Sequence, residues 1–156
     1  MTVYMLSHLD YLRSRLIKDL RAVAQSPGPV TNRLRDFLIV RTLFCWDTYV
    51  WRAHNPEEVT EREEQDSAFE IHFLRRLLQE MQSEFGLQLE DCGSTARMLL
   101  LATDSLVPDR PGAARMRNRD EVRRIAVSLA ETLVQGLLPM RRVGWLESPR
   151  IDSTAL

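Results

Sequence analysis

The sequence predicts an all-α protein with a single domain, and three observations carry that prediction. Apolar residues recur every three or four positions along most of the chain, which is the helical period. No segment shows the β-branched alternation of a half-buried strand. The six glycines and seven prolines gather mostly in five places and leave segments of helix length between them. We therefore predict about five main helices in one domain over 1–140, followed by a C-terminal tail, 141–156, whose position and composition permit disorder.

The first two predicted helices flank a Pro-Gly-Pro turn at 27–29. The first has a single apolar stripe, as a helix packed on the surface of a core does, made of Leu9, Leu12, Leu16, Leu20 and Val23. The second, about 31–54, is apolar around most of its circumference, which predicts a central helix. Its apolar residues are Leu34, Phe37, Leu38, Val40, Leu43, Phe44, Trp46, Tyr49, Val50 and Trp51.

The third helix is expected to begin near 55–58, where Asn55 supplies an N-cap and Pro56 fits the first helical position. Its polar opening turns, 57–66, are expected to lie in solvent. Ser67 and Glu70 have the spacing of a capping box and offer a second start. The part expected to be buried contains Phe69, Phe73, Leu74, Leu77, Met81 and Phe85.

The last two predicted helices are unusually apolar. The fourth, about 94–107, leaves scarcely any face for water, so we expect it to be covered on both sides. The fifth, about 118–138, opens with Asn118 as N-cap and Glu121 as the acid of a capping box. Its stripe contains Val122, Ile125, Ala126, Leu129, Leu133 and Leu137.

Composition excludes several classes of function. A formal charge of -1 gives no excess of positive charge, so nucleic-acid binding by this chain alone is disfavoured. The longest apolar run, 98–102, is far too short to span a membrane, and the start has no signal-peptide pattern. Cys45 and Cys92 are far apart and lack a neighbouring ligand, which fits a reducing cytoplasm. We expect a cytoplasmic protein without membrane contact.

No motif points to catalysis. His8, His54 and His72 lie on separate segments without metal-ligand spacing, and no glycine-rich nucleotide loop is present. The acidic run 57–64 is expected to be solvated, with ordinary pKa values. A basic cluster over 115–124 suggests either an acidic partner or a solvated surface, and the acids Asp109, Asp120 and Glu121 favour the second. We therefore predict no enzyme activity, no metal and no cofactor.

A ligand cavity is one interpretation of the aromatic residues in the middle helices, and a plain hydrophobic core is the other. The cavity would lie among the second, third and fourth helices. Asp104 interrupts an apolar helix and must find a partner, for which Arg97 is the nearest local candidate. The candidate ligand-binding residues are Phe44, Trp46, Tyr49, Phe69, His72, Phe73, Leu99 and Asp104.

The order of the segments resembles one family. RLRDFL at 33–38 opens a long helix, FLRRLL stands at 73–78, and the pair ARMLLLATDSL at 96–106 and AETLVQGLL at 130–138 closes the series. This pattern is similar to the C-terminal domain of TetR-family bacterial repressors. The resemblance implies an inducer cavity among the middle helices and a homodimer through a four-helix bundle of the last two helices. Such regulators begin with a helix-turn-helix DNA reader, and this sequence has no room for one before Leu6. The expected explanation is either that the chain is a truncated or processed fragment or that it is a natural variant without the reader.

Two hypotheses follow. The first is a ligand-sensing and dimerisation domain of a TetR-like transcriptional regulator, which binds a small hydrophobic effector and would control a DNA reader outside this chain. The second is a stand-alone helical dimerisation or interaction protein without a small-molecule pocket. A homodimer is also favoured by the apolar surface of the last two helices, which exceeds what one small domain covers. The expected interface contains Met98, Leu101, Val122, Ile125, Ala126, Leu129, Leu133 and Gly136.

Overall fold

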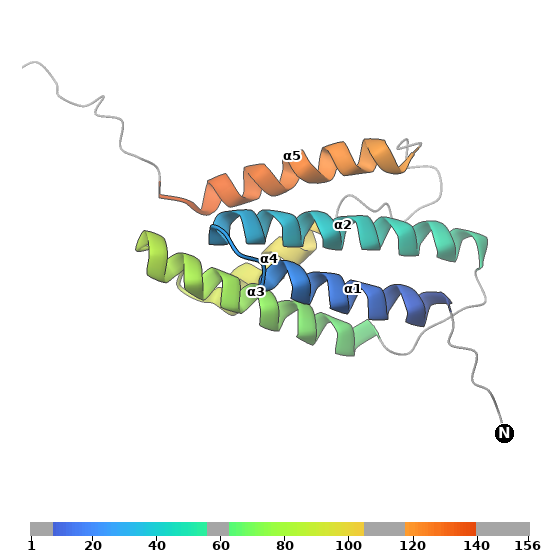
Figure 1. Cartoon of the computed structure of the whole chain (residues 1–156), viewed down its shortest axis with the longest axis horizontal. Helices are drawn as coiled ribbons and strands as arrows, with labels where there is room; N and C mark the ends of the chain where they lie inside the picture. The colour runs from blue at the N-terminus through green and yellow to red at the C-terminus, as the bar shows by residue number, and fades with distance from the viewer. Residues whose placement is uncertain (1–7, 56–62, 105–117, 140–156) are drawn as a thin grey trace, which may run out of the picture.

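The protein is all-α, as the sequence predicts. The computed structural model describes residues 8–55, 63–104 and 118–139, which form five helices and no strand (Figure 1). The helices are α1 (His8–Ala24), α2 (Val30–His54), α3 (Glu63–Phe85), α4 (Cys92–Asp104) and α5 (Arg119–Leu137). The expected tail, 141–156, and the loop that precedes α5 lie outside the described residues.

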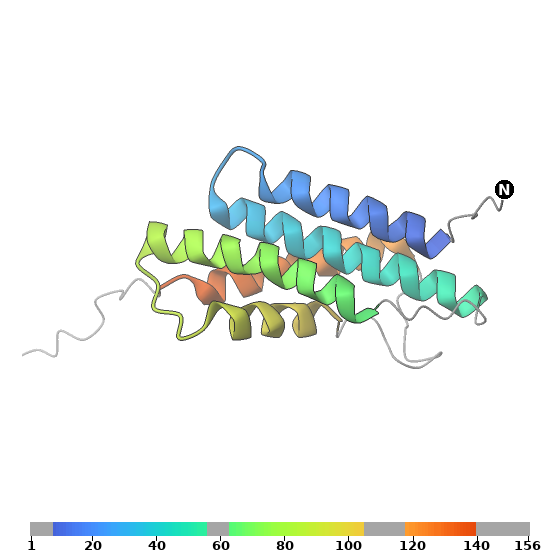
Figure 2. The same cartoon turned by 90° about the horizontal axis from the view of Figure 1, so that it is seen from below.

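The long helix α2 is central, as its apolar circumference predicts. It packs against each of the other four helices. In Figure 1, α5 lies above α2 and α1 lies below it, and no Cα atom of α1 is within 8 Å of one in α5. Figure 2 shows α1 and α4 at opposite edges of the bundle. Different faces of α2 therefore pack against different helices, and α1 and α5 do not contact each other.

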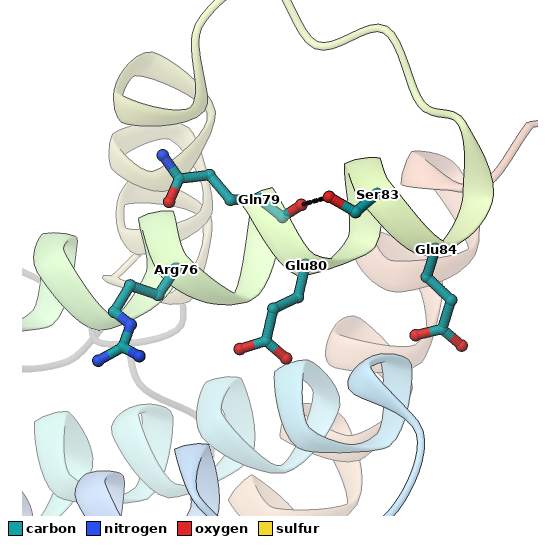
Figure 3. A pocket seen from close by; sticks show the side chains of 5 residues that line it. All are labelled: Arg76, Gln79, Glu80, Ser83 and Glu84. Carbon is teal, nitrogen blue, oxygen red and sulfur yellow. Dashed lines mark hydrogen bonds between the residues drawn. The ribbon is translucent and has the colours of Figure 1, made fainter.

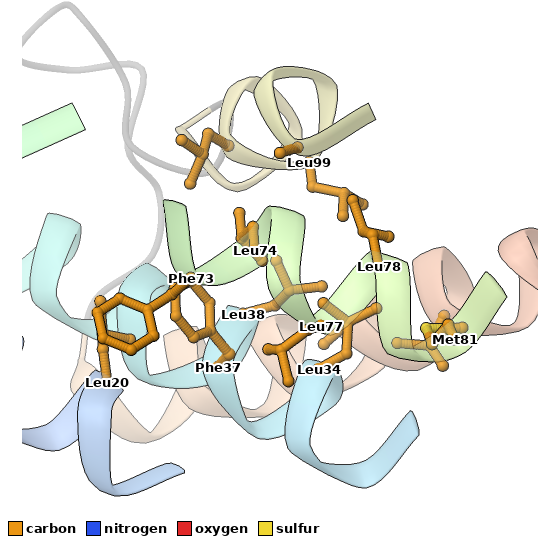
Figure 4. Packing of buried hydrophobic residues seen from close by; sticks show 14 of the residues in the cluster. Leu20, Leu34, Phe37, Leu38, Phe73, Leu74, Leu77, Leu78, Met81 and Leu99 are labelled. Carbon is orange, nitrogen blue, oxygen red and sulfur yellow. The ribbon is translucent and has the colours of Figure 1, made fainter. Parts of the chain in front are cut away.

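The hydrophobic core lies mainly where α2 meets α3 and α4. Phe37 and Leu38 of α2 are fully buried, and Leu74 and Leu77 of α3 pack beside them (Figure 4). Leu20 closes the cluster from α1. Burial of these side chains is the main favourable term for folding and fixes α2, α3 and α4 against one another.

The helix ends have local causes. Asn118 caps α5, since its side chain accepts a hydrogen bond from the backbone N–H of Glu121 at 2.8 Å, as predicted. Helix α4 begins two residues earlier than expected because the carboxylate of Asp91 accepts hydrogen bonds from the backbone N–H groups of Gly93 and Ser94. The turn between α1 and α2 uses Gly28 at φ 122°, a conformation that favours glycine.

The start of the third helix differs from one expectation. Residues 56–62, which contain the predicted proline start, lie outside the described residues. The chain is already helical at Glu63, so Ser67 and Glu70 lie inside α3 and do not open a new helix. Glu70 is instead buried, where it serves an ion pair described below.

Candidate functional site

A hollow of about 520 Å³ lies where the first turn of α1, the last turns of α2 and the first residue of α5 meet. The volume is within the range of small-molecule sites. Its lining is mostly apolar and aromatic, and consists of His8, Leu12, Trp46, Asp47, Val50, Trp51, His54, Asn55 and Arg119.

Aromatic rings form much of this hollow. Trp46 is 8% exposed, and its ring centroid lies 5.9 Å from that of Tyr49. The His8 ring packs on Trp51 with the two centroids 4.0 Å apart, which joins α1 to α2. Flat, rigid side chains of this kind offer large contact area to an apolar or aromatic molecule at a small cost in conformational entropy.

One ion pair supplies charge to the hollow. The Nε atom of Arg119 donates to Oδ1 of Asp47 at 3.0 Å, and its Nη2 atom donates to Oδ2 at 3.2 Å. The hydrogen bond to Asp47 raises the pKa of Arg119. The bidentate pair joins the start of α5 to α2, and the two charges compensate each other.

A second, smaller hollow of about 150 Å³ adjoins the first. It shares Leu12, Asp47 and Arg119 with the larger hollow, so the ion pair lies between the two. Its other lining residues are Arg15, Leu16, Asp19, Val40, Leu43 and Phe44. Arg15 and Asp19 are an i,i+4 pair 3.7 Å apart, so the charges of this hollow are also compensated.

A buried polar cluster lies on another face of α2. Arg41, 8% exposed, donates to Oε2 of Glu70 at 3.1 Å and to Oγ1 of Thr103 at 2.9 Å, and it also donates to the Asp104 carboxylate. The cluster joins α2, α3 and α4. The expectation that Arg97 pairs with Asp104 is wrong, because Arg41 reaches that carboxylate directly from α2 while Arg97 is exposed.

The surroundings of the cluster shift the pKa values of Arg41 and Cys45 upward. Burial lowers the pKa of Arg41, but the Glu70 and Asp104 carboxylates, with the hydrogen bond to Asp104, outweigh burial, and the net direction is upward. Burial raises the pKa of the Cys45 thiol to about 12. The Cys45 Sγ–H group donates a hydrogen bond to Oδ1 of Asp104, with 3.6 Å between the sulfur and oxygen atoms. The thiol is therefore neutral at physiological pH, which makes Cys45 a poor nucleophile.

The predicted ligand-binding residues fall on two sides of α2. Trp46 and Phe44 line the larger and smaller hollow respectively, with Tyr49 half-buried beside Trp46. The remaining candidates lie toward α3 and α4: Phe73 and Leu99 are core residues, Phe69 packs edge-on against Phe73, His72 is exposed, and Asp104 belongs to the Arg41 cluster.

Neither hollow is bounded by α3 or α4, where the cavity was expected. The residues that sequence reasoning missed come from α1 and α5, chiefly His8, Leu12 and Arg119. The sequence analysis counted Trp51 among the apolar residues of the second helix. Its position in the helical period does not distinguish a residue that lines a hollow from one in the core.

The predicted interface residues are also divided by the structure. Met98 and Leu101 are 69% and 68% exposed on the face of α4 that points away from the core. Val122 and Ala126 are each 1% exposed, because α5 turns them inward, and they are not available to a second chain. Three residues are half-buried and one is exposed: Ile125, Leu129, Leu133 and Gly136 respectively.

A third hollow, of about 470 Å³, lies along α3 and is lined by polar and charged residues (Figure 3). All its lining residues come from this one helix: Arg76, Gln79, Glu80, Ser83 and Glu84. Glu80 is engaged by Arg33 of α2, and Ser83 donates a hydrogen bond to the backbone oxygen of Gln79. Charged, exposed side chains on a single helix form a solvated surface and not an enclosed site.

Among the described residues, no group of three or more histidine, cysteine or acidic side chains is placed to hold a metal ion. None of the helices in the described ranges is both long and apolar enough to cross a membrane. Comparison with protein-family models, with curated proteins and with solved structures finds no significant match to this chain.

Proposed function

We propose that this chain is the ligand-sensing and dimerisation domain of a TetR-like transcriptional regulator, and that a small hydrophobic effector binds in the larger hollow. The observation that carries the proposal is the aromatic lining of that hollow, with Trp46 from the middle of α2, Trp51 from its end and His8 from α1. A concave, mostly apolar volume with a few polar groups is the usual form of a small-molecule site.

Binding without catalysis fits the polar groups of the hollow. Asp47 and Arg119 are engaged with each other, so neither is poised as a free acid, base or nucleophile. In this proposal the protein is not an enzyme and needs no cofactor. The effector acts by changing the arrangement of helices, which in a cytoplasmic regulator alters the spacing of two DNA readers outside this chain.

Dimerisation is supported by the outer face of α4. Met98 and Leu101 are large apolar side chains exposed on adjacent turns, and a partner that covers them removes that surface from water. The same observation favours the second candidate function, a helical dimerisation or interaction protein that binds no small molecule. The two candidates differ in whether the hollow takes a ligand.

The uncharged dye Nile red is a suitable probe of the hollow. We expect its fluorescence to rise when it binds the protein, and we expect Leu12→Arg, which places a charge in the wall shared by both hollows, to abolish that rise. Tyr11→Arg is the matched control, because Tyr11 is the neighbouring residue on α1, is 55% exposed and lines neither hollow.

Both variants are checked for folding by circular dichroism before titration. A fluorescence rise that Leu12→Arg leaves intact contradicts binding in this hollow. If neither Nile red nor other apolar compounds bind the folded protein, the interaction-protein candidate replaces the sensor.

A further inference from the structure

We infer that the two adjoining hollows form one site for an elongated, uncharged ligand with an aromatic group in the larger hollow, an aliphatic chain in the smaller one and a neutral hydrogen-bonding group between them. The inference rests on the proposed function and names the chemical class of the effector. Asp47 and Arg119 belong to the lining of both hollows and mark the position of the central group.

The two hollows lie along one stripe of α2. One side of α2 carries Val40, Asp47 and Trp51, because their spacings of seven and four residues return to the same side of a helix. Leu43 and Phe44 lie on the turn between Val40 and Asp47. At 1.5 Å per residue, positions 40 and 51 are separated by about 16 Å along the helix axis. Leu12 of α1 contributes to both walls, so the site is elongated and not spherical.

The two ends of this site differ in character. The larger hollow contains the Trp46 and Trp51 rings and the His8 imidazole, which match the flat face of an aromatic group. The smaller hollow has the branched aliphatic side chains of Leu16, Val40 and Leu43 beside one aromatic ring and one compensated ion pair, those of Phe44 and of Arg15 with Asp19. Its volume of about 150 Å³ matches a narrower chain. A ligand that fills both ends therefore has a ring and an alkyl chain.

The ion pair selects an uncharged group at the centre. Arg119 keeps N–H donors beyond the two that Asp47 accepts, and the carboxylate keeps unused lone pairs. An amide matches both, because its carbonyl accepts from Arg119 and its N–H donates to Asp47. A ligand carboxylate would stand beside Asp47 and a ligand cation beside Arg119, where each meets a like charge, whereas a neutral amide leaves the ion pair intact.

A series of N-alkylbenzamides tests this inference by isothermal titration calorimetry. We expect affinity to rise about fourfold for each added methylene, which is the value of burying that group, until the smaller hollow is full, and then to level off. We expect an alkylbenzene of equal length to bind more weakly because it lacks the amide. We also expect 4-alkylbenzoate and 4-alkylbenzylammonium ions to bind more weakly than the amides.

Leu43→Trp places a ring in the smaller hollow and is expected to remove the gain from chain length while N-methylbenzamide binds as before. Ser14→Trp, on the exposed side of α1, is the control and is expected to retain the gain. Val40→Phe serves the same purpose if Leu43→Trp does not fold.

Three results overturn the inference and spare the proposed function. The first is benzamide binding that is independent of chain length, and the second is tighter binding of a charged analogue. Chain-length dependence that survives both Leu43→Trp and Val40→Phe also overturns it, because the chain then lies elsewhere. If the folded protein binds none of these compounds and no Nile red, the proposed effector site fails together with the inference.

Discussion

Arg41 and Asp47 lie in the same helix but make ion pairs in different surroundings. The side chains of Arg41 and Glu70 are 9% and 7% exposed, whereas those of Asp47 and Arg119 are 34% and 56% exposed. A buried charge that loses its partner is costly because water cannot replace the lost interaction. An exposed pair gains little from its mutual attraction, since water and salt screen it. The Arg41 cluster therefore has the larger consequence for stability.

Arg41→Met is expected to lower the free energy of unfolding by about 3–5 kcal/mol, because it removes the cation that pairs with the buried Glu70 carboxylate at 3.1 Å. Urea denaturation at fixed protein concentration measures this change. The double variant Arg41→Met/Glu70→Met is expected to recover much of the loss, since both buried charges are then absent.

Arg35→Met is the matched control for this prediction. Arg35 is on the same helix and pairs with Asp36, but the side chains are 37% and 48% exposed, so we expect a change of less than about 1 kcal/mol. Equal losses for Arg41→Met and Arg35→Met would contradict the role assigned to the buried cluster.

At the scale of one element, α4 depends on its ends and on one buried face. It has 13 residues, a length at which an isolated helix is marginal in water. Ala96, Leu99, Leu100 and Thr103 are buried, whereas Met98 and Leu101 lie on the opposite face in solvent. We expected α4 to be covered on both sides, but within one chain only the face with Ala96 and Leu99 is covered, and the face with Met98 and Leu101 is exposed. Capping by Asp91 and packing against α3 and α2 are what hold the helix in place.

Asp91→Ala is expected to destabilise the protein more at pH 7 than at pH 2. Hydrogen bonds from Ser94 and Gly93 lower the pKa of the Asp91 carboxyl in the folded protein. A lowered pKa contributes stability above the pKa of the unfolded chain, and that contribution is lost as the pH falls through the folded value.

Thermal unfolding of both proteins across this pH range measures the difference, and Asp91→Asn is the companion variant because its amide oxygen retains a cap. A loss for Asp91→Ala that is the same at pH 2 and pH 7 would show that the carboxylate charge has no part in it.

At the scale of the whole molecule, the proposed dimer covers the outer face of α4. We expect light scattering to give a mass of twice the 18.1 kDa of one chain at micromolar concentration. Replacement of both Met98 and Leu101 by Asp is expected to give monomers, because charge would enter a desolvated interface. Stable interfaces bury about 1,200–2,000 Å², so neighbouring parts of the surface must join in.

Ser14→Asp, at an exposed position of α1 on the opposite edge of the bundle from α4 (Figure 2), adds charge away from the expected interface and is expected to leave the dimer intact. A monomeric wild-type protein at these concentrations would remove dimerisation from the proposed function but would not affect ligand binding in the hollow.

Local patterns were sufficient to predict the all-α class and the positions of α2 and α5 to within one residue. The second helix was expected at about 31–54 and is observed at Val30–His54, because helical period, proline and glycine act over only a few residues. The same local chemistry predicted the Asn118 cap of α5. The start of α4 was missed since Asp91 lies before the apolar residues that marked that helix.

The candidate site depended on contacts between residues far apart in the chain. Arg41 meets Glu70 across 29 positions, and Asp47 meets Arg119 across 72, so neither pair is visible in local spacing. Periodicity placed Phe44, Trp46 and Phe73 among apolar helices but did not say which neighbour each would face. Packing decided that, because side-chain volume and helix crossing are properties of the assembled bundle. Helices α1 and α5 do not contact each other, and the two hollows lie where both meet α2, whereas α3 and α4 pack together against another face of α2.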